Sequence, residues 1–177
     1  MVNLKISFGL SVSEIKKAQK QIRDYQKSLN RKCEILCSRL NEIGNRVALQ
    51  SINESPLGKT IVLSSEISST NTGCKAILTS IGQDKTNEYG TVNTLLLVEF
   101  GAGIHFNATA NPKASEMGMG VGTFPDQTHA FEDGWYYLNE DNRWVYTHGT
   151  KATMPMYNAM KAIREQYVTV AKEVFKS

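Results

Sequence analysis

A chain of 177 residues can bury one hydrophobic core and is too short for two, so we expect a single domain over residues 1–177. Hydrophobic residues make up 41% and charged residues 21%, which is ordinary for a globular fold and argues against a disordered chain or a membrane protein. The apolar runs fall far short of the roughly 20 residues of a spanning helix, and no signal-peptide pattern opens the chain. We therefore expect the protein to stay in the cytosol where it is made.

The net charge of +3 conceals a strong asymmetry along the chain. Residues 1–50 carry ten Lys or Arg and four acidic residues, a balance of +6, whereas residues 99–143 carry two and seven, a balance of −5. A basic segment and an acidic segment can attract each other between copies of one protein.

The chain opens with a short expected strand and a long expected helix. Residues 2–8 alternate apolar and polar side chains, which predicts a strand that ends at Gly9. Ser11 and Glu14 have the spacing of a capping box and predict the start of a helix over residues 12–53. The apolar residues of this helix follow a seven-residue repeat, namely Ile15, Ala18, Ile22, Tyr25, Leu29, Leu36 and Ile43.

If unbroken, this helix would be roughly 60 Å long, more than its own domain could cover. Its first half is too polar to lie wholly within a core, because it carries Lys16, Lys17, Lys20, Arg23, Lys27, Arg31 and Lys32. We expect part of it to project or to pack against a neighbouring molecule. The alternative is a helix bent near residues 28–31 whose charged face is simply solvated.

Strands are expected over residues 59–100. Pro56 and Gly58 predict the end of the helix, since both residues disfavour its continuation. Residues 59–68 and 74–82 then predict a hairpin, followed by a polar loop over 83–90. A third strand is expected over 92–100, because its apolar centre suits a strand that is covered on both faces.

The last third of the chain contains a long loop, a hairpin and a helix. Residues 101–133 are glycine-rich and aperiodic, which is typical of a binding loop or of a segment ordered by a partner. An aromatic hairpin is predicted over 134–147, and an amphipathic helix over 154–176 that begins near Pro155. This order predicts an α+β fold in which both helices pack on a mainly antiparallel sheet of four to five strands.

The residue types that carry catalysis are scattered along the chain. Cys33 and Cys37 lie four residues apart on the expected helix and, with Cys74, form an odd set that favours packing over metal binding. The glycines of residues 117–122 lack the lysine and the strand-to-helix context of a phosphate-binding loop. We therefore expect no enzymatic activity and no cofactor.

Two alternatives remain open at this stage. His129, Glu132 and His148 could form the site of a small metal-dependent hydrolase, although none of the histidines has a histidine partner at the usual helical spacing. The basic helix could contact DNA phosphates, but it also carries acidic residues and lacks interleaved aromatic residues. Direct nucleic-acid binding is therefore the weaker expectation.

Residues 95–103, with the sequence LLLVEFGAG, resemble the hallmark of the siphophage tail-completion proteins, also called the neck or minor tail component family. In that family a strand ends in a turn that resembles Val-Glu-Phe-Gly-Thr-Gly. The matching residues here are Val98, Glu99, Phe100, Gly101 and Gly103. Ala102 stands where the family usually has threonine or serine.

Three further features agree with this family and follow in the expected order. They are the basic N-terminal helix, the element from Pro56 to Gly58, and a closing element before the last helix. The closing element consists of Gly149, Ala152 and Pro155, followed by Met156, where the family often has phenylalanine, and by Ala159. The long insertion between Gly103 and Trp135 and the aromatic hairpin depart from the pattern and leave the use of that loop in doubt.

The resemblance implies a structural virion protein of a tailed phage or prophage that forms a ring, as a hexamer, at the head–tail junction. It implies contacts with copies of itself and with head connector, tail terminator or tail-tube proteins, no membrane, and residence in the host cytoplasm before assembly. A ring subunit needs two complementary surfaces, and the basic helix and the acidic middle segment supply such a pair. The candidate interface residues are Lys16, Lys20, Arg23, Lys27, Arg31, Glu99, Phe100, Gly101, Asp126, Glu132 and Asp133.

For Glu99 and Phe100 the sequence leaves three roles open. They can orient the turn at Gly101 or contact the next subunit, or Phe100 can be plain core while Glu99 caps local backbone amides.

Overall fold

The structure, a computed structural model, describes residues 6–7, 9–70, 72–87, 90–103, 113, 116, 134–138 and 141–176. Its elements in chain order are α1 (Val12–Asn53), the 3-10 turn η1 (Gly58–Thr60), β1 (Val62–Thr70), β2 (Gly73–Ile81), β3 (Asp84–Asn87), β4 (Gly90–Asn93), α2 (Thr94–Phe100), β5 (Trp135–Leu138), β6 (Trp144–Thr147) and α4 (Pro155–Lys176). The predicted α+β class, with a long N-terminal helix and a C-terminal helix, is confirmed.

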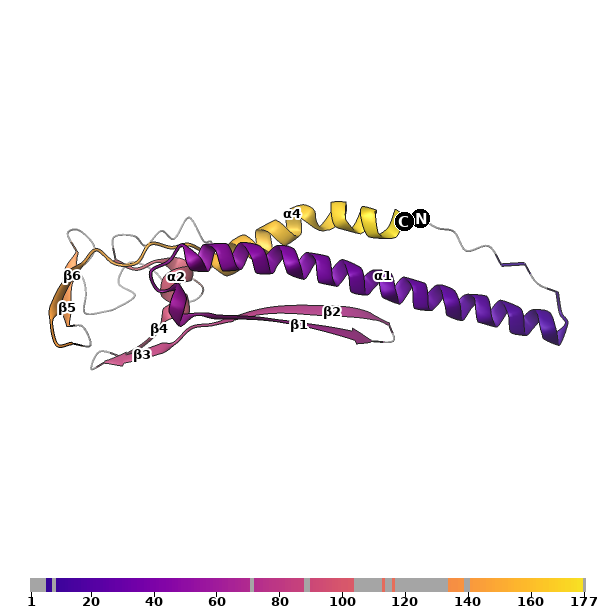
Figure 1. The fold of residues 1–177 in the computed structure, drawn as a ribbon, viewed down its shortest axis with the longest axis horizontal. Coiled ribbons are helices and arrows are strands. Elements are labelled where there is room, and N and C mark those ends of the chain that lie inside the picture. The colour runs from indigo at the N-terminus through magenta and orange to yellow at the C-terminus, as the bar shows by residue number, and fades with distance from the viewer. Residues whose placement is uncertain are drawn as a thin grey trace.

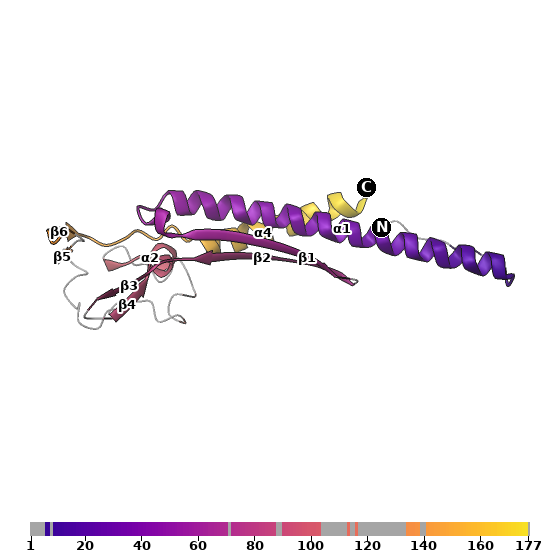
Figure 2. The same cartoon turned by 60° about the horizontal axis from the view of Figure 1, so that its bottom comes forward.

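The molecule is elongated along α1. This helix runs unbroken for 42 residues, about 63 Å at 1.5 Å per residue, so the alternative of a break near residues 28–31 is wrong. Figure 1 shows α4 along one side of α1 and the β1–β2 hairpin along the other, while α1 extends past both of them at its N-terminal end. Figure 2 shows the same arrangement after rotation. Over the described residues, no helix is long and apolar enough to cross a bilayer.

Both ends of α1 form as the sequence predicts. The hydroxyl of Ser11 accepts a hydrogen bond from the backbone N–H of Glu14 over 3.3 Å and donates one to the Glu14 carboxylate. This carboxylate also accepts from the backbone N–H of Ser11, which completes the capping box. The hydrogen bond from the Ser11 hydroxyl lowers the pKa of Glu14. The helix ends at Asn53, and the chain then turns so tightly that a Cβ at Gly58 would lie 2.2 Å from the carbonyl oxygen of Ile52.

The hydrophobic core lies along the second half of α1. This half, together with α4 and the β1–β2 hairpin that pack on it, is called the body here. Ala48 is fully buried and Ile52 is 3% exposed on this helix, while Ala159 and Val170 are buried on α4. Gly44 lies where α4 and the hairpin close on α1, because a Cβ there would lie 2.7 Å from Cδ1 of Ile163 and 3.3 Å from Cδ2 of Leu78. Small residues on α1 therefore allow both neighbours to pack closely.

Among the described residues, the strands form three separate two-stranded antiparallel sheets instead of one sheet of four to five strands. β1 pairs with β2 from Val62 with Ile81 to Thr70 with Gly73, which confirms the first predicted hairpin. It begins at residue 62 and not at 59 because residues 58–60 form a 3-10 turn. β5 pairs with β6 and confirms the aromatic hairpin, in which the rings of Tyr136 and Tyr146 lie 4.9 Å apart.

Residues 83–100 differ from the prediction. The expected polar loop forms the hairpin β3–β4, and most of the expected strand over 92–100 is the helix α2. Asn93 caps this helix, since its side-chain oxygen accepts a hydrogen bond from the backbone N–H of Leu95 over 2.9 Å. A run of four apolar residues has no period of its own, so the sequence pattern alone could not separate a buried strand from one turn of buried helix.

Two predicted segments fall largely outside the described residues. In the expected strand over 2–8, only Ile6 and Ser7 are described, and they have no regular structure. In the expected loop over 101–133, only residues 101–103, 113 and 116 are described.

Replacing Gly44 with leucine is expected to destabilise the fold by about 1–3 kcal/mol, because the added side chain must displace Ile163 and Leu78. Gln50→Leu is the matched control, since Gln50 is exposed on the same helix. Chemical denaturation of both variants measures the free energy of unfolding, and an equal effect at the two positions would contradict the packing at Gly44.

Candidate functional site

The buried junction of α2 with the start of α4 is the best-defined polar site in the described chain. Glu99, the penultimate residue of α2, is 7% exposed. Its Oε2 accepts a hydrogen bond from the backbone N–H of Met156, and its Oε1 accepts one from the backbone N–H of Tyr157, both over 2.9 Å. The first amide groups of a helix have no acceptor within that helix, so this carboxylate caps α4 from another element.

Burial dominates the electrostatics of this carboxylate. Removal from water raises the pKa of Glu99, and the two backbone hydrogen bonds from Met156 and Tyr157 offset only part of that increase. Of the roles left open by the sequence, this geometry is that of a cap for backbone amides, but these amides are distant in the sequence and not local as expected. The prediction that Glu99 lies at the end of a central strand is wrong, because it lies near the end of a helix that Asn93 initiates.

The backbone around Glu99 is bound to the segment that precedes α4. The carbonyl oxygen of Val98 accepts hydrogen bonds from the N–H groups of Thr153, over 2.9 Å, and of Met154, over 3.2 Å. The N–H of Ala102 donates to the carbonyl oxygen of Thr150 over 2.8 Å. Gly149 has a φ of +104°, and a Cβ there would lie 2.0 Å from the carbonyl oxygen of Ala102, so only glycine fits this contact.

Phe100 and Gly101 complete the junction. Phe100 is 2% exposed and belongs to the core, which leaves little of its surface for a neighbouring subunit. Gly101 ends α2 with a φ of +77° and a ψ of 175°, a conformation that is nearly restricted to glycine. Residues 98–103 and residues 149–155, which carry the resemblance and are about fifty positions apart, thus form one hydrogen-bonded unit.

Two polar residues of this junction were not singled out from the sequence. The hydroxyl of Thr94, at 1% exposure, accepts hydrogen bonds from the backbone N–H of Gln83 over 2.9 Å and from the hydroxyl of Thr60 over 2.8 Å. The side-chain amide of Asn158 donates to the carbonyl oxygen of Thr153 over 3.0 Å. The position of Thr94 directly before an apolar run could have indicated a buried polar residue. No sequence pattern indicated a role for Asn158.

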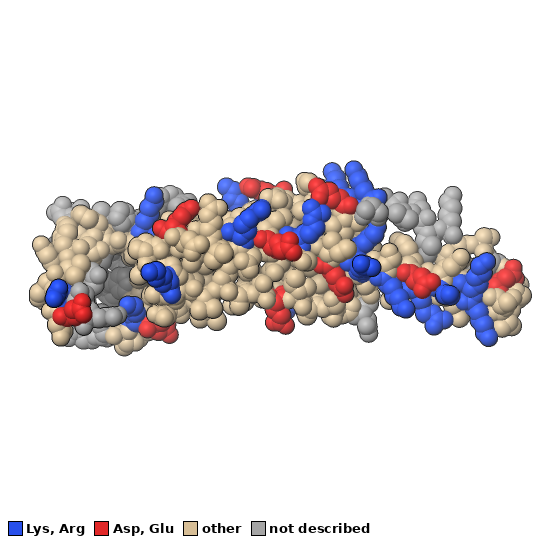
Figure 3. Space-filling view, viewed as in Figure 1, with Lys and Arg blue, Asp and Glu red and all other residues tan. Residues whose placement is uncertain are grey.

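The predicted basic residues lie on a projecting part of α1, called the arm here and defined as residues 12–31. Every residue of the arm except Ala18 and Asn30 is exposed. Figure 3 shows the cations gathered at this end of the molecule with only a few acidic side chains among them. They include the predicted candidates Lys16, Lys20, Arg23, Lys27 and Arg31. Asp126, Glu132 and Asp133 lie outside the described residues, so pairing of basic and acidic surfaces stays a prediction.

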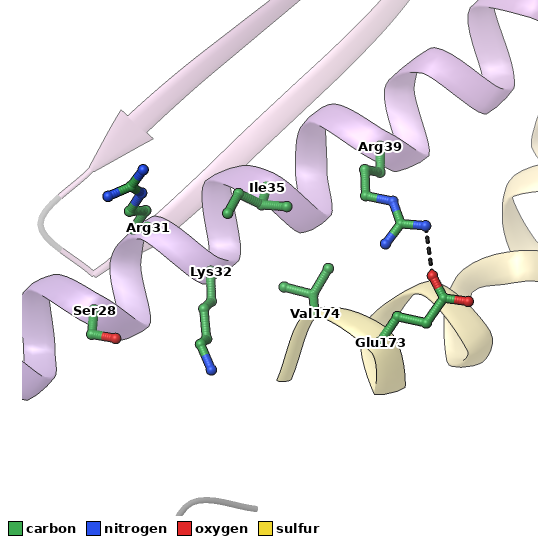
Figure 4. Close-up of a pocket in the computed structure, with 7 residues that line it drawn as sticks. All are labelled: Ser28, Arg31, Lys32, Ile35, Arg39, Glu173 and Val174. Carbon is green, nitrogen blue, oxygen red and sulfur yellow. Dashed lines mark hydrogen bonds and ion pairs between the residues drawn. The ribbon is translucent and has the colours of Figure 1, made fainter. Parts of the chain in front are cut away.

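A cleft of about 410 Å³ marks the point where α4 ends against α1. It is lined by Ser28, Arg31, Lys32, Ile35, Arg39, Glu173 and Val174, as Figure 4 shows. Nη2 of Arg39 lies 2.6 Å from Oε2 of Glu173, but both side chains are about half exposed, so this ion pair stabilises the helix contact by no more than about 1 kcal/mol.

The cysteine and histidine candidates show packing roles where they are described. Burial, followed by the neighbouring thiols of Cys74 and Cys33, raises the pKa of Cys37 to about 11, so this thiol stays protonated at neutral pH. His129 and Glu132 lie outside the described residues, and His148 packs edge-on against Tyr146 with ring centroids 5.1 Å apart. Among the described residues, no group of three or more His, Cys, Asp or Glu side chains is arranged so that it could hold a metal ion.

Comparison of the chain with protein-family models, with curated proteins and with solved structures found no match.

Removing the Glu99 cap is expected to destabilise the protein in two steps. Glu99→Gln keeps one acceptor oxygen and should cost about 1 kcal/mol, whereas Glu99→Ala leaves two amides without their acceptor and should cost about 2 kcal/mol or more. Glu165→Gln, on the exposed face of α4, is the control. Equal unfolding free energies for wild type and Glu99→Ala would contradict the role of the cap.

The raised pKa of Glu99 gives this carboxylate a defined pH signature. The native state keeps the proton at pH values where the unfolded chain has released it, so its contribution to stability is complete below the ordinary value of 4.5 and is lost as pH rises through the raised pKa. Glu99→Gln does not titrate at this position. The unfolding free energy of wild type minus that of Glu99→Gln should therefore fall as pH rises above 4.5. If this difference rises with pH instead, the hydrogen bonds from the amides of α4 lower the pKa of Glu99 by more than burial raises it.

Proposed function

We propose that this protein is a structural subunit of a tailed bacteriophage or prophage, a tail-completion or neck protein that assembles with copies of itself into a ring, as a hexamer, at the head–tail junction. Its partners would be the head connector, the tail terminator or tail-tube proteins. The virion would be its final location, after a period in the host cytoplasm.

The observation that carries this proposal is the apolar surface that the described part of the chain leaves exposed. It includes Val12 at 70% and Ile22 at 52% exposure on α1, and Val62 at 64% and Ile81 at 59% on the hairpin. Large apolar side chains left in water favour contact with another protein surface. A protein of this shape gains stability by assembling.

The junction at Glu99 brings together the two motifs that resemble tail-completion proteins, although the first motif ends a helix here and not the strand of the family pattern. The two short motifs behind that resemblance meet in space and depend on each other chemically, since Glu99 caps α4 and Gly149 lies against Ala102. Matching residues with a joint structural role are a stronger basis for a family proposal than two unrelated runs of common residues.

The exposed cations of the arm favour a second candidate, an accessory protein that binds DNA phosphates through this helix. Lys16, Lys20, Arg23 and Lys27 are all exposed and lie within three turns of one helix. The mixed charge of the arm, which also holds Glu14 and Asp24, makes this the weaker candidate.

Deletion of the gene from the parent phage tests the proposed function. The expected result is separate heads and tails in electron micrographs, with infectivity restored by the protein supplied from a plasmid. Complementation with the Glu99→Gln variant is the control, because it tests whether a modestly destabilised protein still restores infectivity. Normal joined virions without the protein would refute the proposal, and binding of DNA that weakens steeply with added salt would then favour the second candidate.

A further inference from the structure

The arm carries an apolar stripe that stays exposed in the folded chain. Ile15, Ile22 and Leu29 follow one another at intervals of seven residues and are 37%, 52% and 39% exposed. Tyr25, at 39% exposure, and Ala18, the one buried member, lie between them at spacings of three and four. This alternation of three and four is the pattern of a helix that packs along its length against another helix.

The stripe continues a face that is covered elsewhere on the same helix. Leu36 and Ile43 extend the seven-residue repeat into the half of α1 where α4 and the β1–β2 hairpin pack, and both of them are partly buried. The cleft between Ile35 and Val174 is the place where the cover by α4 ends. Except at Ala18, which is 5% exposed, the arm therefore presents the same kind of surface as the second half of α1 without the cover that this half receives.

The residues beside the stripe indicate what covers it. Gln19, Gln21, Gln26 and Ser28 flank the stripe on its two sides and are neutral, and Glu14 is the one charged residue among its flanking positions. The lysines and arginines of the arm lie on the outer side, at the positions farthest from the stripe. An acidic protein or a nucleic acid would be attracted to that outer side, whereas an identical arm can approach the stripe without repulsion between like charges.

We infer that the arm is a self-association helix whose stripe, formed by Ile15, Ala18, Ile22, Tyr25 and Leu29, packs against the same stripe of a neighbouring copy. The arms lie parallel, an orientation that rests on the proposed function because all subunits of a ring point the same way. In this orientation Gln21 of one copy faces Gln26 of the next, and two neutral amides can form a hydrogen bond there.

The mass of the full-length protein in solution tests this inference. Analytical ultracentrifugation over a range of concentrations should show self-association of the wild type, and it should become at least about tenfold weaker in the double variant Ile22→Glu, Leu29→Glu. The double variant Lys20→Gln, Lys27→Gln changes the outer side of the same helix and should associate at least as strongly as the wild type. Thermal unfolding of all three proteins checks that the body of the molecule is intact.

Cross-linking locates the contact directly. Under mild oxidation Ile22→Cys should form a disulfide between copies through residue 22, whereas Lys20→Cys should not, and peptide mapping separates these links from those of the natural cysteines. A wild type that is monomeric at every concentration would overturn the inference. So would an assembly that survives both glutamates and forms no link at residue 22; in that case another surface closes the ring, and the proposed function, which is tested in the virion, still stands.

Discussion

The length of α1 is the constraint on which the rest of this structure depends. Its 42 residues span about 63 Å, whereas the 22 residues of α4 reach about 33 Å and the nine-residue strands of the first hairpin about 30 Å. Two covers of about half the length of the helix cannot bury all of it. One half of α1 therefore lies in a core and the other half projects, and the exposed area of the molecule follows from this mismatch.

The Glu99 cap fixes the position at which α4 begins to cover α1. By binding the amides of Met156 and Tyr157, this carboxylate fixes the first turn of α4 against α2, and the direction of α4 along α1 then follows. The contact of Gly149 with Ala102 holds the chain that enters this turn. A buried carboxylate is a costly way to cap a helix, since burial alone opposes its ionisation. Its cost is offset because one side chain satisfies two amides and joins two parts of the chain.

Elements with a clear period or a clear terminal signal could be predicted from the sequence. Local chemical causes that act within a few residues determine several of these features. They are the start of α1 at Ser11, its end before Pro56, the two outer hairpins and the start of α4 at Pro155. The helix α2 could not be predicted in this way, because its apolar run has no period and its conformation depends on partners such as Gln83 and Thr153, which are distant in the sequence. The separation of the strands into three sheets depends in the same way on packing that no local pattern records.

The candidate site was predicted in its residues but not in its geometry. The sequence identified the motif around Glu99 but not its role. The backbone amides that Glu99 binds lie in the first turn of α4, and nothing in residues 95–103 indicates which distant residues donate to it. The arm shows the opposite case, because both its charge and its seven-residue repeat are local properties.

These two local properties of the arm act against each other. The apolar stripe favours contact between copies, while the cations on the outer side repel other copies over a distance of about a Debye length, 8 Å at physiological salt. The residues beside the stripe, which are neutral except for Glu14, keep the cations away from the contact itself. Repulsion between the outer cations therefore weakens the contact between free arms but does not prevent it. In the proposed ring, the bodies of the subunits would hold the arms side by side and would supply the local concentration that charge repulsion otherwise lowers.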